Sequence, residues 1–165
     1  MSKPDKRSFV YVKSNKDFTF LETYSGYWNF LPDPEGKKYL LSPSASDGEI
    51  GSAIYEAVSV SRQVDPQSCP EFFDLMGRVA PEYAEWVNGL MKEFGYKTKR
   101  AMFKDMKSCA VELVGRSIVM QPSHHEKLEA WSEKGISKDD YVVVSADSSP
   151  DQIGFALRLA LSRCT

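Results

Sequence analysis

The first thirty residues have the hydrophobic pattern of β-strands. Residues 9–12 and 18–21 are short runs rich in aromatic and β-branched side chains, which favour extended structure. The polar run 14–17 between them is typical of a hairpin turn. Aromatic residues crowd the segment 24–30, and the turn that follows at 32–36 contains two prolines and a glycine. The pattern therefore predicts that the chain opens with a β-hairpin.

A short strand followed by an amphipathic helix occurs twice along the chain. Strand 39–41 precedes a helix near 47–61, and strand 141–144 precedes a helix near 150–163. The apolar positions of the first helix recur 103 residues later in the second. We expect two similar strand–helix units, although two amphipathic helices can also match by chance.

The starts of these two helices carry matching local signals. Each has the spacing of a capping box, formed by Ser46, Glu49, Ser149 and Gln152. Each also has a glycine in its first turn, Gly51 or Gly154, which would permit close approach of the helix to the sheet. No Gly-rich phosphate loop surrounds either glycine, so no nucleotide site is indicated.

The middle of the chain has helical periodicity. Residues 72–79 keep helical spacing, and a longer helix at 81–94 has an apolar stripe that we expect in the core. Gly95 follows directly, where a glycine commonly ends a helix. Residues 123–131 are predicted as one more short helix.

A second hairpin is predicted at 109–121. A two-residue loop that begins with Gly115 separates two apolar runs. This register pairs Leu113 with Ile118 and Val111 with Met120 on one face. Cys109 falls on the same apolar face, which predicts a buried and inert thiol.

Together these elements predict one α/β (α+β) domain over residues 1–165, with a mixed or largely antiparallel sheet covered by three to five helices. A chain of this length buries roughly two thirds of its unfolded surface without a disulfide or metal. Nine Phe, eight Tyr and three Trp supply the core, and 42% of the residues are hydrophobic.

Charge and cysteine content exclude several classes of protein function. The net charge of −2 argues against general binding to nucleic acid or to an anionic membrane. No apolar run approaches the ~18 residues that span a bilayer, and the first residues have no signal-peptide core. Three widely spaced cysteines fit reduced thiols. We therefore expect a cytoplasmic protein without a direct nucleic-acid or membrane partner.

Motifs for catalysis are weak. A cysteine-dependent hydrolase could be built from Cys109 with His124 or His125, but no family signature surrounds these residues. The cysteines and histidines also lack the short spacings of a structural zinc site. We expect no catalytic residue, no metal and no cofactor.

The charge distribution is more informative. Residues 65–93 contain six acids and two bases, whereas residues 96–109 contain five bases and one acid. Adjacent blocks of opposite charge predict a recognition surface, unless they pair with each other or with solvent. The basic segment 97–107, with Tyr96 and Phe103 nearby, leaves open a small RNA- or single-strand-binding module.

Several stretches together resemble the immunity proteins of bacterial contact-dependent growth inhibition (CDI) systems. They are residues 24–27, 49–54, 61–62, 95–104, 125–132 and 156–164. The resemblance implies a small protein, not an enzyme, that binds and neutralises the C-terminal toxin domain of a large exported effector. It implies no particular interface residue.

The charge pattern suggests where such a partner would bind. A cytoplasmic toxin that acts as a nuclease must hold phosphates and tends to be basic, so an acidic surface would attract it. We expect a monomer in a 1:1 complex. The partner-binding candidates come from the acidic block and the aromatic turn before it: Trp28, Asp33, Glu35, Glu71, Asp74, Glu82 and Glu85.

Overall fold

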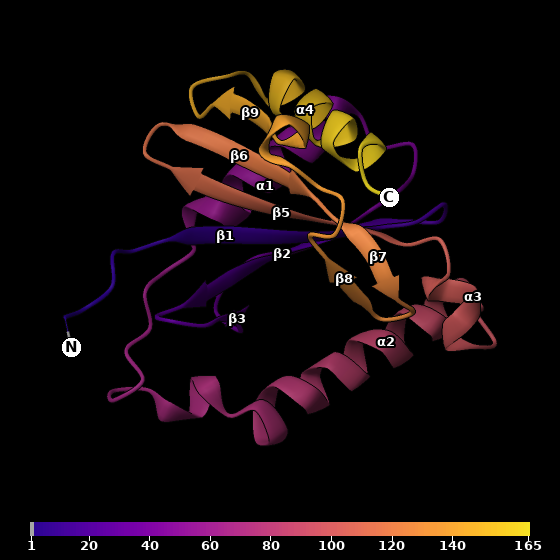
Figure 1. Cartoon of the computed structure of the whole chain (residues 1–165). Coiled ribbons are helices and arrows are strands. Elements are labelled where there is room, and N and C mark those ends of the chain that lie inside the picture. The colour runs from indigo at the N-terminus through magenta and orange to yellow at the C-terminus, as the bar shows by residue number, and fades with distance from the viewer. Residues whose placement is uncertain (1) are drawn as a thin grey trace.

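The strand patterns at both ends of the chain combine into one seven-stranded sheet. The computed structural model describes residues 2–165 (Figure 1). The strands of this sheet are β1 (Ser8–Ser14), β2 (Thr19–Gly26), β3 (Phe30–Pro32), β4 (Lys38–Leu41), β5 (Lys107–Val114), β6 (Ser117–Pro122) and β9 (Val142–Ser145). Their order is β3-β2-β1-β5-β6-β9, and β4 also pairs with β2. Every ladder is antiparallel, which confirms the predicted fold class.

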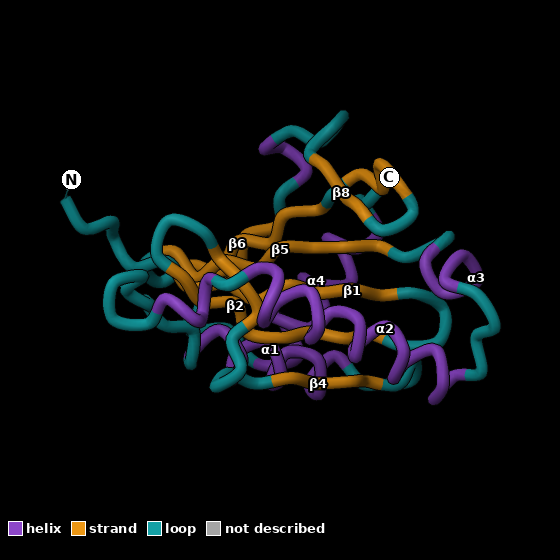
Figure 2. The backbone as a smooth tube through the Cα atoms, turned by 90° about the horizontal axis from the view of Figure 1, so that it is seen from below, coloured by secondary structure: helices purple, strands orange, loops and turns teal. Residues whose placement is uncertain are grey.

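Helices lie on both faces of the sheet (Figures 1 and 2). One face carries α1 (Asp47–Ser59) and α4 (Pro150–Ser162), and the other carries α2 (Ala80–Phe94) and α3 (Lys99–Phe103). Three short turns, η1 (Pro70–Phe73), η2 (Leu75–Val79) and η3 (Lys138–Asp140), complete the helical elements. The segment predicted as one helix at 72–79 is therefore split, because Asp74 has extended backbone angles and caps the π-helical turn η2.

Local capping chemistry sets the starts of α1 and α4, but only one of the two predicted capping boxes is complete. The Ser149 hydroxyl accepts a hydrogen bond from the Gln152 amide, and the Gln152 side chain accepts one from the Ser149 amide. At α1 the Ser46 hydroxyl accepts from the Glu49 amide, but the Glu49 carboxylate accepts from the Ser46 hydroxyl at 3.3 Å and not from the Ser46 amide. Gly95 ends α2 in the left-handed region at φ 73°.

The two glycines predicted to face the sheet instead bring two helices together. A Cβ atom at Gly51 would lie 1.8 Å from the carbonyl oxygen of Pro150, and one at Gly154 would lie 1.9 Å from that of Asp47. Each glycine thus lies against the backbone at the start of the other helix. The expectation of close helix–sheet approach is corrected to reciprocal helix–helix contact between the two similar units.

The sheet separates two hydrophobic clusters. Beneath α1 and α4 the sheet contributes Val10, Val12, Leu21, Val111, Ile118 and Met120, all completely buried. Cys109 lies in this cluster, and β5 pairs with β6 in the predicted register. On the other face a smaller cluster joins Phe18 and Phe20 to the apolar side of α2 and to the α3 region.

The predicted helix at 123–131 is wrong. This segment forms a separate hairpin of β7 (His124–Lys127) and β8 (Ala130–Ser132). Its register places His125 opposite Trp131, and the two rings stack with centroids 4.8 Å apart. The Trp131 indole also donates to the carbonyl oxygen of Met106 at 3.1 Å. These non-local contacts favour the hairpin over the helical spacing of Leu128 and Trp131.

Across residues 2–165, no helix is long and apolar enough to cross a membrane.

Candidate partner-binding site

The face of the sheet that carries α2 is only partly covered. A groove of about 450 Å³ runs between β1 and β2 on one side and η2 and α2 on the other. A second hollow of similar volume continues past the same central side chains to the β7–β8 hairpin. The residues shared by the two are Tyr11, Lys13, Tyr24, Tyr83 and Trp86. An aromatic groove that crosses the face of a sheet is well suited to hold part of another polypeptide.

Strand periodicity explains which side chains form the floor of the groove. Tyr11 and Lys13 of β1 lie beside Phe20, Glu22 and Tyr24 of β2, in a register that pairs Tyr11 with Glu22. Their neighbours in sequence, Val10, Val12 and Leu21, point to the opposite face and are buried under α1. The same two strands thus supply one core face and the floor of the groove.

Lys13 is held in place within the groove. Its Nζ donates to the Ser108 hydroxyl at 2.6 Å and lies 4.1 Å from the centre of the Trp131 ring. Burial lowers the pKa of Lys13 to about 8. The ammonium group is therefore already engaged by the protein itself.

Glu22 is the contrasting charge on the groove floor. Burial raises the pKa of Glu22 to about 7, and the positive charge of Lys38 opposes this shift. Within residues 2–165, no hydrogen bond or ion pair reaches this partly buried carboxylate.

The opposite wall is rigidly braced. Arg78 of η2 donates from Nη1 to both carboxylate oxygens of Glu82, at 2.9 and 2.8 Å, and from Nε to the Phe72 carbonyl oxygen at 2.8 Å. Its guanidinium also lies 4.5 Å from the centre of the Phe72 ring. These contacts fix the start of α2 and hold Glu82 at the groove.

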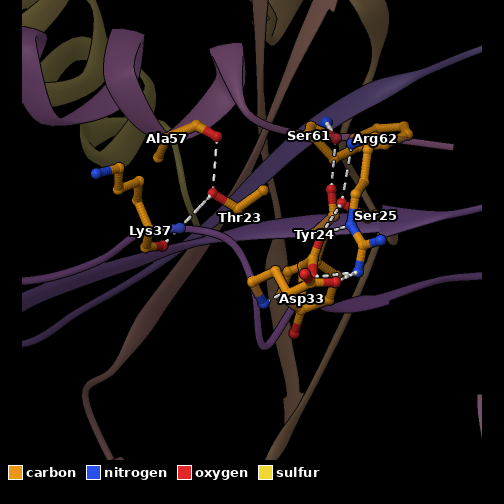
Figure 3. Close-up of polar contacts among 10 residues, drawn as sticks. Thr23, Tyr24, Ser25, Asp33, Lys37, Ala57, Ser61 and Arg62 are labelled. Atoms are coloured by element: carbon orange, nitrogen blue, oxygen red, sulfur yellow. Dashed lines mark hydrogen bonds and ion pairs between the residues drawn. The ribbon is translucent and has the colours of Figure 1, made fainter. Parts of the chain in front are cut away.

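Asp33, predicted as a partner-binding acid, is instead a structural residue. Its side chain is fully buried and accepts hydrogen bonds from Arg62 at 2.8 and 3.0 Å and from the Ser25 hydroxyl at 2.6 Å (Figure 3). Burial alone would raise the pKa of Asp33, but the bonds from Arg62 and Ser25 hold it below its usual value. Glu35 lies on the exposed side of the same arginine, at 2.6 Å.

Neighbouring bonds extend this polar network along β2. The Thr23 hydroxyl donates to the Ala57 carbonyl oxygen at 2.7 Å, and the Ser61 hydroxyl donates to that of Tyr24 at 2.6 Å (Figure 3). The end of α1 is thereby attached to the strand that forms the groove floor.

The remaining predicted residues are exposed but dispersed. Trp28 is 56% exposed in the β2–β3 turn. Glu71 accepts from the Cys69 thiol at 3.1 Å, and Asp74 accepts from the Gly77 amide at 2.8 Å. Glu85 is exposed on α2. Of the seven candidates, only Glu82 lines the groove.

Comparison with known proteins gives the family. Residues 8–164 match the model of the family described as CDI immunity protein. This chain belongs to the CDI immunity protein family. The immunity protein CdiI-YPIII of Yersinia pseudotuberculosis serotype O:3 (strain YPIII) is 45% identical over 170 residues, which cover 96% of each chain.

Two solved structures share the whole fold. A chain of the CdiA-CT/CdiI toxin and immunity complex from Yersinia pseudotuberculosis is 39% identical, with a TM-score of 0.85 over 99% of this chain and 100% of that one. A Neisseria meningitidis protein of unknown function is 32% identical, with a TM-score of 0.86 over the full length of both chains. The resemblance to CDI immunity proteins inferred from sequence is therefore confirmed.

The structure also argues against the hydrolase alternative in this family member. Cys109 is completely buried, and burial raises the pKa of its thiol, which disfavours the nucleophilic thiolate. The His125 ring is occupied by the Leu128 carbonyl oxygen at 2.8 Å and by the stack on Trp131. In the part of the chain described, no three His, Cys, Asp or Glu side chains are grouped to hold a metal ion.

Sequence reasoning missed the groove-lining residues Tyr11, Lys13 and Glu22. The available signal was the position of Glu22, two residues from both Phe20 and Tyr24 on the same strand face. A charged residue between two aromatic ones at that spacing indicates a face that is not simply core.

Proposed function

We propose that this protein binds and neutralises the cognate CdiA-CT toxin of a CDI effector, as a cytoplasmic monomer in a 1:1 complex. The observation that carries the proposal is the full-length likeness to a chain solved in a toxin and immunity complex. The three cysteines are free, which fits a reducing compartment.

The aromatic groove is the surface that best supports toxin binding. Apolar side chains at its edge are unusually exposed, with Leu75 57% and Met76 83% accessible. Contiguous exposed apolar groups beside aromatic walls are typical of protein-binding sites. A toxin segment that enters the groove would cover them.

We further propose that the toxin is a nuclease, because acidic residues predominate in and around the groove. The linings of the two hollows contain more acids than bases: Glu22, Glu82, Glu129 and Glu133 against Lys13 and Lys38. Glu71, Asp74 and Glu85 extend negative charge along η1, η2 and α2. A nuclease presents basic groups for phosphates, which these acids would attract and cover.

Binding is tested with the purified cognate toxin domain and a substitution at the edge of the groove. Met76→Asp alters a side chain that is 83% exposed, so the fold should tolerate it. We expect its affinity for toxin to fall at least about tenfold, as for loss of an interface anchor. Val143→Asp, on the 62% exposed Val143 of β9, is the matched control and should bind and protect growing cells like the wild type.

A separate assay tests the nuclease assignment. Toxin domain is incubated with plasmid DNA and with total RNA, with and without the immunity protein. Degradation of either that stops when the immunity protein is added supports the assignment. Intact nucleic acid beside toxin-dependent growth arrest would contradict the nuclease assignment and leave toxin binding unaffected.

A further inference from the structure

We propose that Glu22 is a specificity-determining anchor of this interface, and that its carboxylate receives a lysine or arginine side chain inserted by the toxin between the aromatic walls of the groove. The inference rests on the proposed function and adds the chemistry of the inserted group.

Glu22 differs from Glu82 and Glu129, whose carboxylates are paired, and from Glu133, which is exposed, because its carboxylate is both partly buried and unpaired among the described residues. Glu82 is held by Arg78, and Glu129 accepts from the Tyr83 hydroxyl at 2.7 Å. Glu112, farther along the same sheet face, pairs with Arg7 at 2.8 Å. No such bond to Glu22 exists in residues 2–165, and its burial leaves the ionised form poorly solvated. An incoming cation would satisfy the carboxylate.

The nearest cations of the protein do not fill this role. Lys13 lies on the neighbouring strand but donates to Ser108 and faces the Trp131 ring. Lys38 lies opposite Glu22 in the β2–β4 register, but among the described residues 2–165 it forms no ion pair within 4.0 Å. The groove therefore retains an attractive but unoccupied position for positive charge.

The surroundings of Glu22 also favour a cationic side chain. Tyr11 and Tyr24 on the floor and Tyr83 and Trp86 on the wall line the same groove. Aromatic ring faces attract ammonium and guanidinium groups, more strongly when water is excluded. A carboxylate within an aromatic enclosure thus selects a basic side chain over an acidic or a purely apolar one.

A polypeptide fits the groove better than a free organic cation. The groove continues past Tyr83 and Trp86 into the second hollow at the β7–β8 hairpin, so its occupant extends across the sheet face. Glu22 is only partly buried, but removing its carboxylate from water costs folding free energy, so a stabilising structural role for Glu22 is disfavoured.

The binding test compares Glu22→Gln with Asp139→Asn in the full-length protein, using the cognate toxin domain. Both variants replace one acid by its amide, but Asp139 is exposed on η3 and lines neither hollow. We expect Glu22→Gln to weaken binding by roughly 30-fold or more, the lower range for loss of an interfacial charge pair. We expect Asp139→Asn to stay within about threefold of the wild type.

Two outcomes separate this inference from the proposed function. Tight toxin binding by the wild type together with an unchanged Glu22→Gln affinity would overturn the anchor and leave the immunity function standing. Absence of toxin binding by the wild type would overturn both.

The pH dependence of binding supplies a readout that a merely structural role would not change. The titratable and charged groups around Glu22 are Tyr11 and Lys13 of β1, Tyr24 of β2, Lys38 of β4, Arg78 of η2, and Glu82 and Tyr83 of α2. A cation binds the ionised carboxylate, so the affinity of the wild type should rise as pH increases through about 7. Lys13 titrates in both proteins, and its pKa is itself raised by the charge of Glu22, so the ratio of the two affinities reports Glu22 together with its effect on Lys13.

We expect the ratio of the Glu22→Gln dissociation constant to the wild-type one to increase about tenfold between roughly pH 6 and pH 8, because the ionised fraction of Glu22 changes by that factor. A ratio that does not change with pH would overturn the anchor even if Glu22→Gln bound more weakly.

Discussion

The two faces of the sheet differ in how completely they are closed. On the α1–α4 face, most core residues of the central strands are completely buried, and the two helices meet at Gly51 and Gly154 without space for a methyl group. On the α2 face, the cluster around Phe20 gives way to a groove that contains Lys13 and Glu22. One face is therefore a closed core, and the other keeps open the groove in which we propose that the toxin binds.

The largest expected effect lies on the closed face. Ile153 is 1% exposed in the contact between α4 and the sheet. Ile153→Ala should lower the free energy of unfolding by about 2–5 kcal/mol, because it removes a large side chain from a filled core. Phe155→Ala on the 62% exposed side of the same helix should change it by less than about 0.5 kcal/mol. Urea denaturation measures both, and equal losses would show that the α4 packing is not as described.

Glycines on the two faces should respond in opposite directions to the same substitution. Gly51→Ala forces a Cβ atom against the Pro150 carbonyl oxygen and should cost about 1–3 kcal/mol of stability. Gly89 of α2 has nothing within 4 Å of the corresponding position, so Gly89→Ala should stabilise by about 0.5–1 kcal/mol through helix propensity. Thermal melts of the two variants measure the difference. Stabilisation by Gly51→Ala would contradict the close helix–helix contact.

Glu22 tests whether a groove residue lowers the free energy of unfolding of the protein. Its pKa in the folded protein, about 7, exceeds the unfolded value of 4.5, so folding becomes less favourable as pH rises from about 4.5 to 7. Glutamine does not ionise, so Glu22→Gln does not lose free energy of unfolding over this pH range. At roughly pH 8 it should be more stable than the wild type by about 1–2 kcal/mol, allowing for partial solvent screening.

The advantage of Glu22→Gln should disappear at roughly pH 4, where the carboxyl group is protonated in both the folded and the unfolded state. Denaturation curves at several pH values measure this trend. A variant that is less stable than the wild type at pH 8 would show that Glu22 has a stabilising partner.

Local signals accounted for much of the fold. Ser46, Ser149 and Gly95 set helix ends to within one or two residues of the prediction, because capping depends on neighbouring residues only. Gly115, at φ 60°, likewise set the β5–β6 hairpin and its register. Where a structural feature depends on residues close in sequence, the pattern was sufficient.

Features that depend on distant residues were missed. Asp33 follows a proline in a polar turn, as an exposed acid would, but Arg62 lies 29 positions away and buries it in an ion pair. The groove was not predicted for the same reason. The exposure of Tyr11 and Glu22 depends on where α2, which is distant in sequence, crosses the sheet. Sequence periodicity assigns side chains to faces but does not show which part of a face stays uncovered.

The smallest expected effect concerns acids near the groove but outside its lining. Glu71 and Glu85 are both exposed, so the charge-reversed pair Glu71→Lys and Glu85→Lys should leave thermal stability nearly unchanged. If the toxin surface is basic, the pair should slow association several-fold at low salt and weaken its salt dependence, with little change in dissociation rate. Asp74 is excluded from the variant because its side chain caps η2 through the Gly77 amide.

The control reverses charge at a distant exposed acid, Asp139 of η3, which should leave the association rate within about twofold of the wild type. Stopped-flow association rates measured against ionic strength distinguish the variants. Faster association of the Glu71 and Glu85 variant would reverse the inferred charge complementarity. That result would indicate that the toxin surface is acidic. The basic side chains of segment 97–107, and not the acidic block, would then attract the toxin.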